Sequence, residues 1–234
     1  MNIAVFVTIW SAGMSSVDLN THFLDAPLDY LKAENAVHTV EIYTPEPGDV
    51  PKMDDVPAPS IIIQIDMNDE DAAVALTQSE KFKQIFLDKN SYDPTAEKIN
   101  LEITEAVHFP LPGLETPPAR TAALSFVVRY YGPVKDEAKF VEMYTSGHPQ
   151  ILAKFEGIRN VLCYLPLNWR STGEVLDEKM IIGNEVVFDD LAALNLAIQS
   201  EVAPEAQGHS KHFQKYGYNT HHAMHRELVF SRQD

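Results

Sequence analysis

Residues 71–80 read DAAVALTQSE, and residues 192–201 read AALNLAIQSE. Both segments have a helical spacing of apolar residues and the same Gln-Ser-Glu ending, and the two endings lie 121 residues apart. Similarity at one fixed offset is typical of a repeated structural unit. The same offset aligns further positions without a gap: Val37 with Ile158, Val40 with Val161, Tyr43 with Tyr164, Pro45 with Pro166, Phe109 with Phe230, and residues 5–7 with 126–128. We therefore interpret the chain as an internal duplication.

Each copy is predicted to have the element order βαββαβ. In the first copy, β-branched and aromatic residues predict strands at 3–10, 37–44, 60–66 and 100–109. Helical spacing predicts helices at 17–34 and after Asn68 or Asp69, either of which can cap the second one. The second copy predicts strands at 121–131, 159–166, 179–188 and 221–230, with helices at 135–156 and 189–201. Prolines and a glycine between residues 110 and 118 predict a linker.

This order is that of a ferredoxin-like unit, an antiparallel sheet with helices on one face. The other face of each sheet must also be covered, and two fused units can cover each other sheet to sheet. The predicted fold class is α+β, with two tandem ferredoxin-like units forming a pseudo-two-fold α+β barrel. The predicted divisions are residues 1–111 for the first unit, 112–120 for the linker and 121–234 for the second unit.

The composition is that of a globular protein, with 45% hydrophobic and 22% charged residues. A net charge of −16 argues against partners that need Lys and Arg, namely nucleic acids and anionic membrane surfaces. No apolar run approaches the roughly 20 residues that span a bilayer. Cys163 is the single cysteine, so we expect no internal disulfide and a reducing compartment such as the cytoplasm. A small molecule remains the expected partner.

The second copy carries a motif that the first copy lacks. Residues 129–133 read RYYGP at the end of a strand, residues 140–144 read FVEMY, His148-Pro149 follow, and Gly157-Ile158 open the next strand. This pattern resembles the EthD family of the dimeric α+β barrel superfamily. The family commonly has His-x-Pro-Leu, whereas here Pro149 follows His148 directly. In the ungapped alignment the first copy has Pro27 opposite His148, so only the second copy is expected to carry a site.

The resemblance implies a cofactor-independent enzyme, of lyase or isomerase type, that acts on a small aromatic, lactone or polyketide-like substrate. Isomerase, cyclase, dehydratase or decarboxylase chemistry would depend mainly on proton transfer. No dinucleotide fingerprint, phosphate loop or nucleophile elbow occurs, and no cofactor is expected. Two alternatives stay open: a non-catalytic ligand-binding or accessory protein of an oxygenase system, and a haem protein. A homodimer is also left open, because one chain already supplies the sheet pairing.

His148 is the first candidate catalytic residue. Its position shares a helical face with aromatic and aliphatic side chains, and Pro149 disfavours the helical conformation there. A helix break would turn the imidazole into the gap between helix and sheet, where it can exchange a proton near neutral pH. The alternative is a purely structural histidine whose imidazole is hydrogen-bonded to a backbone carbonyl. The aromatic residues expected to bind substrate are Tyr130, Tyr131, Phe140 and Tyr144.

Five of the nine histidines lie between residues 209 and 225. The ungapped alignment places His222 and Met224 opposite Leu101 and Ile103, so we predict that both face the helices and that His225 faces the barrel. His222 is therefore the predicted catalytic partner of His148, and Met224 a further substrate-binding residue. Alternation along a strand separates His222 from its histidine neighbours, so no metal site is predicted. Trp169 and Arg170 are candidates for a lid.

Overall fold

The computed structural model describes residues 1–50, 56–167 and 180–232. The strands are β1 (Ile3–Ser11), β2 (Val37–Pro45), β3 (Ile61–Met67), β4 (Ala96–Phe109), β5 (Leu124–Tyr131), β6 (Asn160–Pro166), β7 (Met180–Phe188) and β8 (Tyr218–Ser231). The helices are α1 (Ser16–Phe23), α2 (Ala26–Ala33), α3 (Glu70–Gln78), α4 (Glu80–Phe82), α5 (Glu137–Thr145), α6 (His148–Leu152), α7 (Leu191–Gln199) and α8 (Val202–Ser210). A π-helical turn, η1 (Lys83–Leu87), and a 3-10 turn, η2 (Lys89–Ser91), follow α4.

The strands close into one antiparallel barrel in the order β1-β3-β2-β8-β5-β7-β6-β4. The first half of the chain contributes the run β4-β1-β3-β2, and the second half contributes β8-β5-β7-β6. The two runs are joined by hydrogen bonds between β2 and β8 and between β4 and β6. Every strand of this barrel therefore has two neighbours, and no edge is left open for further pairing.

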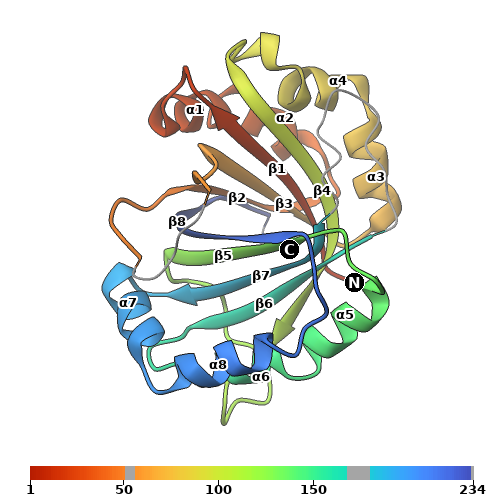
Figure 1. Cartoon of the computed structure of the whole chain (residues 1–234). Coiled ribbons are helices and arrows are strands. Elements are labelled where there is room, and N and C mark those ends of the chain that lie inside the picture. The colour runs from red at the N-terminus through yellow and green to blue at the C-terminus, as the bar shows by residue number, and fades with distance from the viewer. Residues whose placement is uncertain (51–55, 168–179, 233–234) are drawn as a thin grey trace.

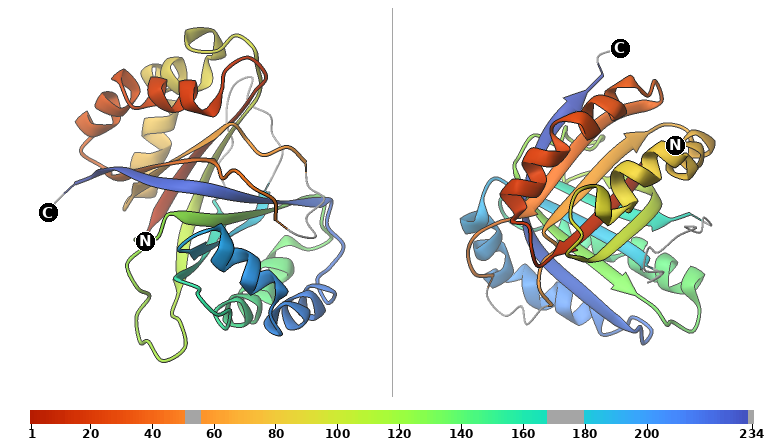
Figure 2. Two further views of the ribbon diagram at one scale, coloured as in Figure 1. Left: turned by 90° about the vertical axis from the view of Figure 1, so that its left-hand side faces the viewer. Right: turned by 90° about the horizontal axis from the view of Figure 1, so that it is seen from above.

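The helices cover opposite sides of the barrel. Helices α1 to α4 lie over the strands of the first half, and α5 to α8 lie over those of the second half (Figure 1; Figure 2). The α+β class and the barrel predicted from the sequence are confirmed. None of the helices in the described ranges is long and apolar enough to cross a membrane.

The two long predicted helices are each split in two. Residues 17–34 form α1 and α2, and residues 135–156 form α5 and α6. Pro27 and Pro149 each stand at the start of the second piece, because proline has no N–H to donate and is tolerated only in the first turn of a helix. The predicted break beside His148 is thus confirmed. Helix α8 and the turns after α3 were missed, because their apolar spacing is short and weak.

Apolar side chains form three clusters because strand residues alternate between two faces. One cluster lies between α1–α4 and the outer wall of the barrel, and a second lies between α5–α8 and that wall. The third fills the barrel interior and includes Phe6, Tyr43, Val127, Tyr164 and Met224. A strand residue therefore faces either a helix layer or the barrel interior, and a shift of one residue exchanges the two.

Candidate functional site

A cavity of about 290 Å³ lies between the helices of the second half and the outer wall of the barrel. Its wall is mostly apolar, with Phe126, Val128, Leu152, Phe188, Leu194 and the small residues Ala203 and Ala206. The polar side chains in the wall are Tyr130, Tyr144, His148, Asn184, Gln207, Ser210, Tyr216, Asn219 and His221. An apolar hollow with a few converging polar groups is the usual form of a small-molecule site.

His148 opens α6 and stands in the wall of this cavity with only 7% of its surface exposed. Its ring packs against Tyr144, Phe213 and His209, with ring centroids 4.8, 5.3 and 5.4 Å away. The Nδ1 atom is fully buried and has no hydrogen-bond partner among the described residues. Burial, and secondarily the neighbouring His209, lowers the pKa of His148 to about 4. The imidazole is therefore neutral near pH 7 and holds an unused polar atom.

The approach of His209 to His148 depends on Gly147. A β-carbon at position 147 would lie 2.7 Å from Nε2 of His209, well inside contact distance. Glycine at the end of α5 thus lets α8 pack closely against α6. This close packing stacks His209 on His148, with an angle of 26° between the ring planes.

The low pKa of His148 predicts a specific dependence of stability on pH. The folded pKa is about 4 and the ordinary value is 6.5, so between these values the unfolded chain binds the extra proton. The stabilisation is fully present above pH 6.5 and is lost as the pH falls towards 4. Relative to a His148→Gln variant, the free energy of unfolding should fall by on the order of 3 kcal/mol across this interval. Urea denaturation at several pH values measures the free energy of unfolding of both proteins. The same pH dependence in the wild type and in His148→Gln would contradict the prediction.

Three tyrosines in the wall keep their protons. Burial raises the pKa of Tyr130, Tyr144 and Tyr216 above the ordinary value. Tyr130 hydrogen-bonds to Tyr144 and to Asn219, and these bonds favour the phenolate of Tyr130 while burial opposes it. Two donors to its oxygen leave the proton of Tyr130 for a further acceptor. Tyr130 is therefore suited to donate a hydrogen bond to a ligand oxygen.

The histidine of β8 that reaches the cavity is His221, and the predicted orientation of His222 and Met224 was wrong. His222 lies opposite Val127 and Met224 opposite Ser125, and both partners face the barrel interior. His221 lies opposite Val128 in the cavity wall, with its ring stacked on Phe126 at 5.8 Å. The structure therefore brings His148 and His221 to one cavity and places His222 on the other side of the wall.

The cause is a change of offset between the two halves. On the first strands the offset is 121, which sets Phe126 opposite Val5 in the alignment. On the last strands it is 120, because Ile103 pairs with Val5 and Ala223 pairs with Phe126. A shift of one residue turns every side chain of a strand to the other face. Position 101 therefore corresponds to His221, which an ungapped alignment could not reveal.

The remaining predicted residues are divided between the cavity and its surroundings. Tyr130 and Tyr144 line it, as predicted. Phe140 is fully buried behind them, 5.8 Å from the ring of Tyr130. Tyr131 is stacked on Tyr218 at 4.7 Å and is not part of the cavity wall. Trp169 and Arg170 lie outside the described residues.

The residues that the sequence prediction missed are Asn184, His209, Tyr216, Asn219 and His221. His209, Tyr216 and His221 belong to the histidine-rich region noted in the sequence. The order of residues in that region does not indicate which side chains face the helices. Within residues 1–50, 56–167 and 180–232, no three His, Cys, Asp or Glu side chains are grouped to hold a metal ion. The cavity, about 290 Å³, lies at the lower end of the range of roughly 300–1,000 Å³ for pockets of drug-sized molecules.

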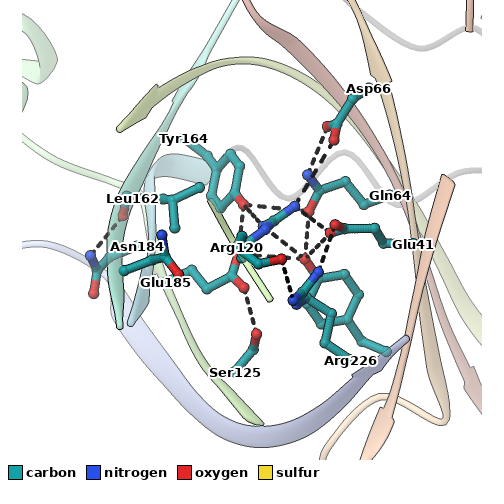
Figure 3. Close-up of polar contacts among 12 residues, drawn as sticks. Glu41, Gln64, Asp66, Arg120, Ser125, Leu162, Tyr164, Asn184, Glu185 and Arg226 are labelled. Carbon is teal, nitrogen blue, oxygen red and sulfur yellow. Dashed lines mark hydrogen bonds and ion pairs between the residues drawn. The ribbon is translucent and has the colours of Figure 1, made fainter. Parts of the chain in front are cut away.

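A second polar cluster fills the barrel interior and is centred on Arg120 (Figure 3). The Arg120 guanidinium donates to Glu185, Tyr164 and Tyr43 at 3.0, 3.1 and 3.2 Å, and it also contacts Glu41. Arg226 reaches the other oxygen of Glu41 at 2.7 Å. Arg120 comes from the segment between the halves, and its partners come from both, so the cluster ties that segment into the barrel.

The two glutamates of this cluster differ in pKa. Burial raises the pKa of Glu41 more than Arg120 and Arg226 lower it. Burial also disfavours the charge of Glu185, but Arg120 and hydrogen bonds from Ser125 and Tyr164 hold its pKa below the ordinary value. The Arg120 guanidinium already has four side-chain partners, Tyr43, Tyr164, Glu185 and Glu41. We therefore interpret this cluster as structural and the cavity beside His148 as the candidate site.

Comparison with known proteins agrees with the architecture. No protein-family model and no curated protein matches the chain. The crystal structure of an anthrone oxidase-like protein is similar, with 14% identity, coverage of 97% of this chain and 93% of that chain, and a TM-score of 0.61. A putative monooxygenase from Fusobacterium nucleatum subsp. nucleatum ATCC 25586 has 10% identity, coverage of 98% and 92%, and a TM-score of 0.57. Identities this low establish the shared fold alone, because one fold can serve many different activities.

The structure of an EthD family protein matches only part of the chain, and too weakly to bear on family membership. An EthD family protein from Bacillus halodurans C-125 is 20% identical and covers 43% of this chain and 95% of that chain, with a TM-score of 0.34. The dimeric α+β barrel fold is thus shown, and membership of the EthD family stays a prediction.

Proposed function

We propose that the chain is an enzyme that binds a small aromatic molecule in the cavity and transfers a proton to His148. One observation carries this proposal: a buried, neutral imidazole with an unpartnered Nδ1 atom stands in the wall of an apolar cavity. Buried polar atoms are nearly always hydrogen-bonded, and an exception is a candidate for function. A small movement of the ring or its neighbours would open this buried atom to the cavity, and a ligand that brings a donor or an acidic proton would then satisfy it.

The charges around the cavity favour a substrate that becomes an anion. Proton transfer from a C–H or O–H group to His148 leaves an imidazolium beside an enolate or phenolate. The pair attracts strongly in a cavity of low dielectric, which offsets the burial that holds the imidazole neutral. Tyr130 and Tyr216 keep their protons and can donate to the anionic oxygen, in the manner of an oxyanion hole. Substrate and site would thus be matched in charge only after the transfer.

The substrate class proposed is an aromatic ketone, lactone or polyketide-like molecule with a proton acidified by its carbonyl group. Isomerisation, cyclisation, dehydration and decarboxylation all use an enolate of this kind. The description of one structural neighbour as anthrone oxidase-like is consistent with the same class, because an anthrone carries such a proton. The chemistry of His148 does not depend on which step follows.

We further propose that the two halves are copies of one unit, with divisions at 1–111, 112–120 and 121–234. The matching element order and the shared Ser79 and Ser200 helix ends support this. The second copy would carry the one working site. Assembly into a homodimer stays open, since barrel closure within the chain already uses the strand edges.

A second candidate function is binding without catalysis. It is favoured by the pKa of about 4, because a base of low proton affinity is a weak catalyst near neutral pH. In that case His148 would orient a ligand by one hydrogen bond, and the protein would carry or protect an aromatic molecule.

Hydrogen–deuterium exchange separates the two functions. The full-length protein is incubated in D₂O with a panel of aromatic ketones and lactones, anthrone among them, and loss of the acidic proton is followed by NMR. We expect exchange faster than in buffer for at least one compound that also binds. Binding without any gain in exchange would favour the carrier, and the absence of both would contradict a small-molecule site.

A further inference from the structure

The two halves differ in the helical segment that follows α3 in the first half and α7 in the second. Both segments start after a serine in an extended conformation, Ser79 in the first half and Ser200 in the second. In the first half, Phe82 and Phe86 point inwards and are 0% and 1% exposed. In the second half, α8 turns Ala203 and Ala206 inwards instead. Two large aromatic side chains are thus replaced by two methyl groups.

The first half has one residue more than the second between these serines and the last strand, and we assign it to the π-helical turn of this segment. The π-helical turn η1 has a hydrogen bond from the amide of Asp88 to the carbonyl of Lys83, five residues back. Such a turn accommodates one more residue than an α-helix. It accounts for the spacing of four between Phe82 and Phe86, against three between Ala203 and Ala206. It also accounts for the offset of 121 before the segment and 120 after it, so Phe86 corresponds to Ala206.

The two phenylalanines fill the space between helices and barrel in the first half. Their rings lie 4.7 Å apart, and Phe86 stacks on Phe23 at 5.8 Å with an angle of 7°. They share one cluster with Val5 and Val7 of β1. At the corresponding places in the second half, Tyr144, Phe126 and Val128 line the open cavity.

A hollow of about 290 Å³ is also present in the first half, but it lies further out. Its wall consists of residues from α2, α3 and their ends, with Met67 as the contribution of the sheet. It contains no residue of β1 or β4, because Phe82 and Phe86 occupy that depth. The first half therefore shows what the deep space accepts: two aromatic rings, Phe82 and Phe86, tilted by 33° to each other.

We infer that Ala203 and Ala206 determine the substrate specificity of the cavity, and that an aromatic ring of the ligand lies where the Phe86 ring, stacked on Phe23, lies in the first half. The inference rests on the proposed function and adds the residues that set ligand size. The deep end takes the ring, and the polar groups of His148, Tyr130 and Tyr216 meet its substituents.

The test restores the bulk of the first half. Binding of 2-naphthol and phenol to the full chain is measured by calorimetry for the wild type, Ala203→Phe and Ala206→Phe. Ala192→Phe makes the same change at an exposed position of α7 and serves as the control. We expect a loss of about 10–200-fold in affinity for 2-naphthol, the range for added bulk in a hydrophobic pocket, and wild-type affinity for Ala192→Phe.

Graded variants keep the result interpretable. Ala203→Val adds less bulk, so it should lower the affinity for 2-naphthol more than the affinity for phenol. If circular dichroism shows that Ala203→Phe is unfolded, Ala203→Val is used for the test instead. Wild-type affinity for 2-naphthol in folded Ala203→Phe, or in Ala203→Val when only that variant folds, would overturn this inference and leave the proposed function standing. A wild-type protein that binds neither compound would overturn both.

Discussion

Replacement of Arg120 by methionine is expected to lower the free energy of unfolding by about 3–5 kcal/mol, the usual cost of removing one partner from a buried ion pair. The side chain is 9% exposed, and it stands between two carboxylates that are 6% and 1% exposed. Without it, Glu41 keeps its ion pair with Arg226, and Glu185 loses its ion pair with Arg120. The two tyrosine oxygens also lose a donor. Equilibrium denaturation by urea measures the difference.

A double variant shows that the loss comes from the unpaired charge. Adding Glu185→Gln to Arg120→Met removes the uncompensated carboxylate, so the double variant should be more stable than the two single losses added together. Arg159 is the matched control, because its ion pair with Asp189 is half-exposed and its replacement should change stability little. An Arg120→Met protein as stable as the Arg159 variant would show that the cluster does not hold the barrel together.

Replacement of His148 by alanine is expected to slow ligand hydrogen–deuterium exchange by about 10²–10⁴-fold, the typical contribution of a general base. The change removes the neutral imidazole and leaves Tyr130 and Tyr216 in place. Affinity for the ligand should change far less than the exchange rate, because most of the cavity wall is apolar. The rate in D₂O and the dissociation constant are measured on the same preparation.

His212→Ala is the control for this experiment, since His212 is exposed and belongs to the same histidine-rich region. The pH profile supplies a second readout. The base form of His148 is lost only as the pH falls through about 4, so wild-type exchange should persist well below pH 6.5. Exchange that is unchanged in folded His148→Ala would assign the proton transfer to another group, with His221 the next in the cavity.

Much of the fold could be predicted because it follows from local patterns. Runs of β-branched and aromatic residues located the strands, and Pro149 indicated the helix break beside His148, whereas the break at Pro27 was not predicted. The orientation of β8 could not be predicted, because it depends on one residue inserted in a distant π-helical turn. His221 and His222 are adjacent, and their chemistry is identical, so no local pattern distinguishes them. A gap placed between the Gln-Ser-Glu segments and the last strands would have chosen correctly.

The cavity itself was also beyond a search for chemical motifs. Its polar residues are recognisable types, but the space exists because Ala203 and Ala206 are small. Alanine in a helix is unremarkable in composition and gives no functional indication. Only comparison with Phe82 and Phe86, after correction for the inserted residue, shows that these positions differ.

The pairing of β2 with β8 sets the order in which the molecule can be completed. Thr39 lies beside Ser231. Pairings between residues so far apart in the sequence form slowly, because the long intervening segment must first bring its ends together. Strand β8 also supplies Asn219 and His221 to the cavity. Insertion of β8 between β2 and β5 therefore closes the barrel and completes the cavity wall in the same step, and a chain in which β8 has not paired lacks both groups.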